Sequence, residues 1–186
     1  TNEFEGSVGF YDRGDQFYGD KIEGNKYTFD KEDTAESFTF GGPIIKDKAF
    51  FYLTYEESTV TNPVLYGPAG SGAANEQAIT LEQVDYLRNL TKTKYGWDPL
   101  GVATTTESQQ ENTSLRIDWI INDSHRVTYN YKNTEGDRLR AEGSNSRFYF
   151  ESASYFKGEE TDTSSILLVS DWSDNLISEI YYSTKS

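Results

Sequence analysis

The sequence of 186 residues contains no cysteine and only one histidine, His125. The absence of cysteine excludes disulfides, thiol catalysis and cysteine zinc sites, and a single histidine leaves almost no scope for a histidine metal site. The longest apolar run is 49–53, far short of the roughly 20 residues that a membrane-spanning helix needs. A transmembrane helix is therefore excluded, and His125, which follows Asp123 and Ser124, is interpreted as a turn residue.

Basic residues are scarce as well, because 17 Lys and Arg stand against 31 Asp and Glu and give a formal net charge of −14. A chain this acidic repels phosphates, so we expect no nucleic-acid partner. Aromatic residues are abundant, with 14 Tyr, 11 Phe and 3 Trp making up 15% of the chain. Acidic disordered segments are poor in aromatics, so this composition indicates a folded chain, and it favours β-structure.

Alternation of apolar and polar residues predicts about seven strands in one antiparallel, up-and-down meander. Three short polar turns are expected near 46–48, 122–124 and 173–175. Three long loops are expected at 12–35, 59–109 and 136–160. Turns and loops alternate strictly along the chain, so all short turns should lie at one end of the sheet and all long loops at the other.

The second long loop contains the only segment with helical spacing, at 81–95. Thr80 is suited to be its N-cap, Gln83 completes a capping box, and Gly96 is suited to be its C-cap. A short helix alone in water is marginal, so its apolar stripe needs a covering surface; the stripe is Leu81, Val84, Leu87 and Leu90. We expect this helix to fold as a lid over the long-loop end, which would be the outer mouth of a barrel, and to pack against the third long loop, where it should contact the aromatic residues 148–150.

Outer-membrane β-barrels combine short turns at one end, long loops at the other, and strands that are apolar outside and polar inside. Strands in a soluble antiparallel sheet also alternate when one face is buried. The pattern alone therefore leaves two fold classes open, a membrane barrel and a soluble antiparallel sheet.

Three stretches of the sequence follow a known pattern: 1–7 (TNEFEGS), 40–51 (FGGPIIKDKAFF) and 115–126 (LRIDWIINDSHR). They resemble the start of the barrel in TonB-dependent outer-membrane receptors of the Oar-like branch. The first resembles the strand that follows the plug domain, with Glu5 where histidine is common. The second resembles the next hairpin and is the most specific, and the third resembles a later hairpin. The long loops carry no such resemblance.

The resemblance implies an all-β fold, part of a large transmembrane barrel of about 22 strands with a plugged lumen, located in the bacterial outer membrane. Such receptors are not enzymes; they bind an extracellular solute or secreted protein and import it with energy from TonB. The implied partners are outer-membrane lipid, the rest of the barrel, and TonB through a plug segment that this chain lacks. The chain begins with Thr-Asn-Glu rather than Met, and we expect it to be the N-terminal part of such a barrel.

Period-two alternation around the turn near 122–124 predicts which side chains share a face. In a barrel, the lipid face should carry Leu115, Ile117, Trp119, Val127, Tyr129 and Tyr131. The lumen face should carry Arg116, Asp118, Thr128 and Asn130.

Acidic residues gather in the first long loop, where flexible carboxylates could bind calcium. The candidate ligands are Asp12, Asp15, Asp20 and Glu23, but they lack regular calcium-loop spacing, so a solvated acidic loop is favoured and no other cofactor is expected. The alternative function is a standalone acidic β-sheet module that recognises a protein or carbohydrate partner through its loops. A glycosidase is disfavoured, because the acidic residues cluster in loops rather than facing each other from strands.

Overall fold

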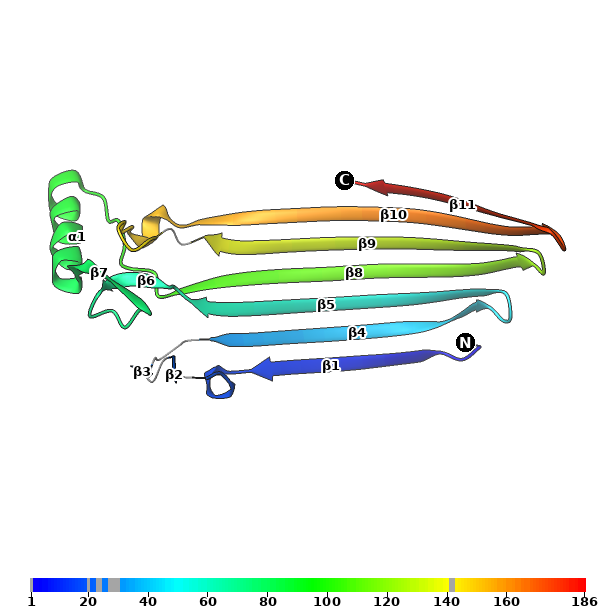
Figure 1. Cartoon of the computed structure of the whole chain (residues 1–186), viewed down its shortest axis with the longest axis horizontal. Helices are drawn as coiled ribbons and strands as arrows, with labels where there is room; N and C mark the ends of the chain where they lie inside the picture. The colour runs from blue at the N-terminus through cyan, green and yellow to red at the C-terminus, as the bar shows by residue number, and fades with distance from the viewer. Residues whose placement is uncertain (1, 20, 23–24, 27–30, 141–142) are drawn as a thin grey trace.

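A seven-stranded antiparallel sheet dominates the computed structural model, which describes residues 2–19, 21–22, 25–26, 31–140 and 143–186. The strands lie side by side in chain order (Figure 1) and are β1 (Glu5–Arg13), β4 (Glu32–Ile45), β5 (Ala49–Pro63), β8 (Thr105–Asn122), β9 (His125–Arg140), β10 (Tyr155–Ser173) and β11 (Leu176–Lys185). The sheet is open, with β1 and β11 at its two edges. The predicted antiparallel meander of seven strands with one helix is confirmed.

Short turns join the strands at one end of the sheet, at 46–48, 123–124 and 174–175. The longer connections lie at the opposite end (Figure 1). They carry the shorter elements: η1 (Asp15–Phe17), β2 (Lys21–Ile22), β3 (Asn25–Lys26), β6 (Tyr66–Ala69), β7 (Asn75–Thr80), α1 (Leu81–Tyr95) and η2 (Glu151–Ala153).

The strands extend further into the long connections than the sequence predicted. β5 continues to Pro63 and β8 begins at Thr105, so the loop predicted at 59–109 is shorter at both ends. β9 continues to Arg140 and β10 begins at Tyr155, although 136–160 was expected to be loop, and β4 already begins at Glu32. Ladder hydrogen bonds join backbone groups and need no apolar side chain, so strands continue where the apolar alternation stops.

Helix α1 has the predicted bounds and caps. The Thr80 hydroxyl oxygen accepts a hydrogen bond from the Gln83 backbone N–H at 3.2 Å, and the Gln83 side-chain oxygen accepts one from the Thr80 N–H at 3.0 Å. Gly96 adopts the left-handed conformation, with φ 68°, and ends the helix. The Asp98 carboxylate accepts bonds from Arg88 at 2.8 and 3.0 Å and from Lys92 at 2.9 Å, which fastens the helix to the segment that follows it.

The apolar stripe of α1 is covered only in part. Val84 is buried, at 2% exposure, whereas Leu87 keeps 38% of its surface exposed, and Leu81 and Leu90 are similarly open. The helix contacts β6 and β7, and residues 148–150 line a small hollow with Tyr66 of β6 and Gln77 of β7. The helix and the aromatic residues therefore adjoin the same strand pair, and their role as a lid stays a prediction.

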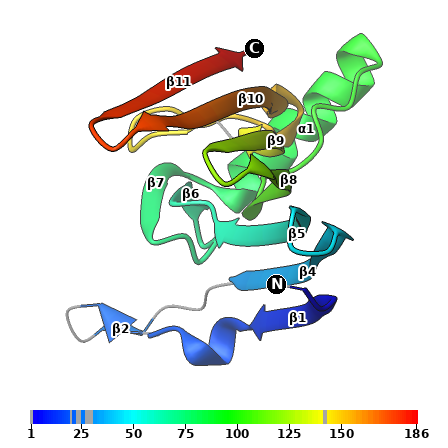
Figure 2. The same cartoon turned by 90° about the vertical axis from the view of Figure 1, so that its right-hand side faces the viewer.

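The described part of the chain packs no second layer against the sheet to form a core. Figure 2, which looks along the strands from the short-turn end, shows them as a single layer. Among the described residues, the buried apolar side chains are Ala49 on the sheet and Val84, Pro68 and Pro99 in the long connection. Within that same part of the chain, no helix is both long enough and apolar enough to cross a membrane.

Candidate functional site: a cationic trough on the polar face

Strand register sorts the side chains of the sheet into two faces, because directly paired residues of antiparallel strands share a face. The six residues predicted to face lipid lie together on one face, through the pairs Leu115–Tyr131, Ile117–Tyr129 and Trp119–Val127. The four residues predicted to face the lumen lie together on the other, through the pairs Arg116–Asn130 and Asp118–Thr128. We call these the apolar face and the polar face.

The apolar face continues across neighbouring strands. On β5 it carries Leu53 and Phe51, and on β4 it carries Phe40, whose ring lies 5.6 Å from that of Phe51. Large apolar side chains remain exposed along it from β1 to β11: Val8, Phe10, Phe38, Phe40, Trp119, Ile166, Ile180 and Tyr182. This face is therefore a contiguous apolar surface that no other part of the described chain covers.

A row of glutamates interrupts the apolar face on the side of the long connections, and beyond it the face carries the paired Leu139 and Phe156. Five directly paired residues, one from each of β4, β5, β8, β9 and β10, form this glutamate row: Glu36, Glu57, Glu111, Glu135 and Glu160. Just before it, Asp162 accepts hydrogen bonds from the Tyr131 hydroxyl at 2.6 Å and from the Asn133 amide at 3.1 Å. On this face, polar side chains therefore replace apolar ones within two successive rows of paired residues, the row of Asp162 and the glutamate row.

The polar face is hydrogen-bonded within itself near the short turns. The Asp118 carboxylate accepts bonds from Arg116 at 2.7 and 2.8 Å and from the Thr128 hydroxyl at 2.8 Å. These residues come from adjacent positions on β8 and β9. Charge on this part of the polar face is therefore neutralised locally.

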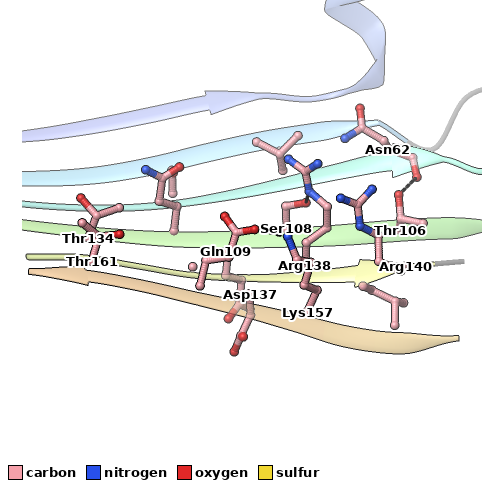
Figure 3. A pocket seen from close by; sticks show the side chains of 16 residues that line it. Asn62, Thr106, Ser108, Gln109, Thr134, Asp137, Arg138, Arg140, Lys157 and Thr161 are labelled. Atoms are coloured by element: carbon pink, nitrogen blue, oxygen red, sulfur yellow. Dashed lines mark hydrogen bonds and ion pairs between the residues drawn. The ribbon is translucent and has the colours of Figure 1, made fainter. Parts of the chain in front are cut away.

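Further along the polar face, close to the long connections, lies a hollow of about 650 Å³ between β5, β8, β9 and β10 (Figure 3). We call it the trough. Three cations line it: Arg138 and Arg140 from β9, and Lys157 from β10, which pairs directly with Arg138. The rest of the lining is mostly polar and uncharged, from Ser58, Asn62, Thr106, Ser108, Gln109, Gln110, Thr134 and Thr161, with Val60, Gly136, Leu139, Asp137 and Glu159 at its border.

The cations of the trough are only partly compensated. Arg138 donates from Nε to the Ser108 hydroxyl oxygen at 3.2 Å, and Lys157 forms an ion pair with Glu159. The ammonium of Lys157, with weaker contributions from Arg138 and Arg140, holds the pKa of the Glu159 carboxyl below its ordinary value. Among the described residues, neither arginine forms an ion pair with a carboxylate.

A second hollow, of about 660 Å³, adjoins the trough and shares Asn62 and Thr106 with it. Its lining is more apolar and includes Pro63, Leu65, Tyr66 and Tyr18. Two cations contact the Tyr18 ring: the guanidinium of Arg13, 4.0 Å from the ring centroid, and the ammonium of Lys31, at 4.5 Å. Burial, together with the hydrogen bond that the Tyr18 hydroxyl donates to Asp33, raises the pKa of Tyr18 to about 12.

Only two of the four calcium candidates belong to the described part of the chain, so the calcium site stays a prediction. Asp12 lies on β1 and Asp15 in η1, while Asp20 and Glu23 fall outside the described residues. Within the described ranges, no group of three acidic or histidine residues is placed to hold a metal ion.

Sequence reasoning missed the trough because its cations fall within the predicted loop at 136–160. One signal was available: Arg138 and Arg140 flank an apolar Leu139, and Lys157 and Glu159 flank Gly158. Both triplets alternate with a period of two, as strands do.

Comparisons of the chain with protein-family models, with curated proteins and with solved structures found no match. Function therefore has to be inferred from the two faces of the sheet and from the trough.

Proposed function

We propose that this chain forms part of the wall of a TonB-dependent outer-membrane transporter of the Oar-like branch. The whole protein would bind an extracellular solute and import it with energy delivered by TonB. The observation that carries the proposal is the contiguous, uncovered apolar face between the short turns and the glutamate row, which is backed by a polar face. Large exposed apolar patches mark sites of contact with lipid or with other proteins.

The extent of the apolar face suits a membrane. On β8 the distance from Ile121, beside the short turn, to Glu111 is about ten residues, or ~33 Å along the strand. At the tilt of about 40° that barrel strands adopt, this corresponds to a height of ~25 Å, the height of the apolar band of outer-membrane barrels. The glutamate row would then lie at the level of the outer lipid headgroups.

Aromatic residues with polar atoms flank the apolar face at both ends, as in the girdles of membrane barrels. Near the short turns these are Trp119, at 48% exposure, and Trp172, at 61%, which donates a hydrogen bond to the Ser178 hydroxyl oxygen at 2.8 Å. Next to the glutamate row they are Tyr131 and Tyr55, whose hydroxyl donates to Glu57 at 3.1 Å. Each ring can place its body in lipid and its polar atom at the interface.

The placement of connections supports the same proposal. Short turns at one end and long connections at the other match the periplasmic and extracellular ends of such barrels. The open edges of β1 and β11 would pair with the rest of the barrel, because unpaired strand edges are avoided in stable proteins.

A lipid-contact measurement tests the proposal in the whole protein that contains this chain. The chain has no native cysteine, so Ile117→Cys on the apolar face and Thr128→Cys on the polar face can each carry a bimane label. Brominated lipid should quench the label strongly at position 117 and weakly at position 128. Equal, weak quenching at both positions would favour the alternative, a soluble acidic sheet that binds a protein or carbohydrate through its loops.

A further inference from the structure

We propose that the trough binds the oxyanion of an organic solute, and that the adjoining hollow holds the apolar part of the same solute. The inference rests on the proposed function, in which the polar face lines the lumen, and it names the chemical class of the solute. The class is a carboxylate or phosphate joined to an apolar or aromatic body.

The first support is charge. The chain carries a net charge of −14, yet Arg138, Arg140 and Lys157 gather on one small part of its polar face. Glu159 is the one carboxylate that the strand register places with them on that face of β10. Asp137 also borders the hollow. Its side chain belongs to the opposite face of the sheet, where its carboxylate lies beside Gly158. The trough is therefore locally positive on a negative protein.

The second support is that folding does not require this arrangement. Arg138 and Lys157 occupy directly paired positions, where like charges destabilise a sheet. The Arg140 side chain is exposed, and among the described residues its electrostatic contact with Glu159 is accompanied by no side-chain hydrogen bond or ion pair. Elsewhere on the polar face, by contrast, Arg116 is held by two bonds to Asp118.

The third support is geometry. Residues two apart on a strand lie roughly 7 Å apart and directly paired residues roughly 5 Å apart, so one oxyanion can reach more than one of these long side chains. In Figure 3, Arg138 and Arg140 extend side by side from β9 in the same direction. The planar fork of arginine matches carboxylate and phosphate oxygens in a bidentate manner.

The fourth support is the neighbouring hollow, which limits what the rest of the solute is. Asn62 and Thr106 line both hollows, so one ligand can occupy the two at once. Pro63, Leu65 and Tyr66 give the second hollow apolar and aromatic surface. A solute that fills both therefore combines an anionic group with an apolar body.

The experiment uses the whole protein in lipid nanodiscs and titrates 1-naphthyl phosphate, with 1-naphthol as the neutral probe. The test variants are Arg140→Gln alone, whose side chain loses no hydrogen bond or ion pair among the described residues, and Arg138→Gln with Arg140→Gln. The matched control is Arg126→Gln, which removes the same charge from the same strand and face but lies outside the trough. Circular dichroism verifies that each variant is folded.

We expect naphthyl phosphate to bind at least tenfold more tightly than naphthol, and the affinity to fall as salt rises. Arg140→Gln should weaken phosphate binding severalfold and the double variant at least tenfold, with Arg126→Gln within twofold of the unmodified protein. The site is overturned if the folded double variant binds naphthyl phosphate as tightly as the unmodified protein does. It is also overturned if the unmodified protein binds naphthyl phosphate and naphthol equally tightly. Either result counts against the site even if lipid quenching places the chain in the membrane. Arginine-dependent binding supports the site whichever result the lipid measurement gives.

Discussion

Glu57 on β5 and Glu111 on β8 occupy directly opposed positions on the apolar face of the sheet. Glu36 extends this row on one side, and Glu135 and Glu160 extend it on the other. Like charges in directly paired positions repel each other. A row of five therefore opposes sheet formation, unless the row meets an environment that solvates or neutralises it, such as a headgroup layer.

Neutralising the centre of the glutamate row should stabilise the sheet. Glu111→Gln removes repulsion with both neighbours, and we expect about 0.2–1 kcal/mol of stabilisation per relieved pair, decreasing as salt is added. The urea midpoint of the protein in detergent micelles measures this. Glu107→Gln is the matched control, because Glu107 lies on the same strand and face but pairs with Thr61; an equal shift in both variants would contradict the explanation.

The assignment of the two faces predicts unequal effects of an introduced charge. In the proposed membrane placement, Ile117→Arg would put a cation on the lipid side near the midplane and should destabilise the protein by ~2–4 kcal/mol, whereas Thr128→Arg, on what would be the lumen side, should be mild. The fraction that runs as the folded, heat-modifiable band in electrophoresis reports the difference. Similar folded yields for the two variants would show that the lipid-facing assignment is wrong.

The chain on its own should not behave as a monomer in water. Its open edges at β1 and β11 and its uncovered apolar face provide surfaces for self-association. Sedimentation velocity should show polydisperse assemblies that a mild detergent disperses. A single monomeric species without detergent would count against the membrane proposal and for the soluble sheet.

The attachment of α1 should depend on pH through Asp98. The hydrogen bonds from Arg88 and Lys92 hold the pKa of the Asp98 carboxyl well below its ordinary value. The stabilisation is therefore present above the ordinary carboxyl range and is lost as the pH falls below it. Hydrogen exchange of the helix amides at neutral pH should be several times faster in Asp98→Asn, with Asp123→Asn, a turn residue, as control. Unchanged exchange in Asp98→Asn would rule out this attachment.

Local sequence patterns were sufficient to predict the helix and the central hairpin, because both depend on residues that are close together in the chain. Thr80, Gln83 and Gly96 placed the helix at its observed bounds, and alternation between 114 and 132 placed the central hairpin. The same rules ended β9 too early, because they required apolar alternation, which fades beyond Tyr131 while the backbone ladder continues to Arg140. Side-chain polarity does not determine where backbone pairing stops.

The trough and the glutamate row depend on register, which a single sequence does not contain. Lys157 meets Arg138 only because β10 pairs with β9 at one particular offset, and a slip of one residue would move Lys157 to the other face. Glu57 and Glu111 are likewise brought together across a long connection. Features assembled from distant segments therefore became visible only in the structure.

The unequal lengths of the connections also indicate an order of assembly. Hairpins β4–β5 and β8–β9 close over turns of two or three residues, whereas the β5–β8 pairing must close the connection 64–104. That connection is on the order of ten times longer than the turns, which costs about 2 kcal/mol more in chain entropy at closure. Local hairpins should therefore form first, and the joining of β5 to β8 should be the slow step. The capped helix and the β6–β7 pair lie within this connection, so their early formation would shorten the free chain and speed the joining.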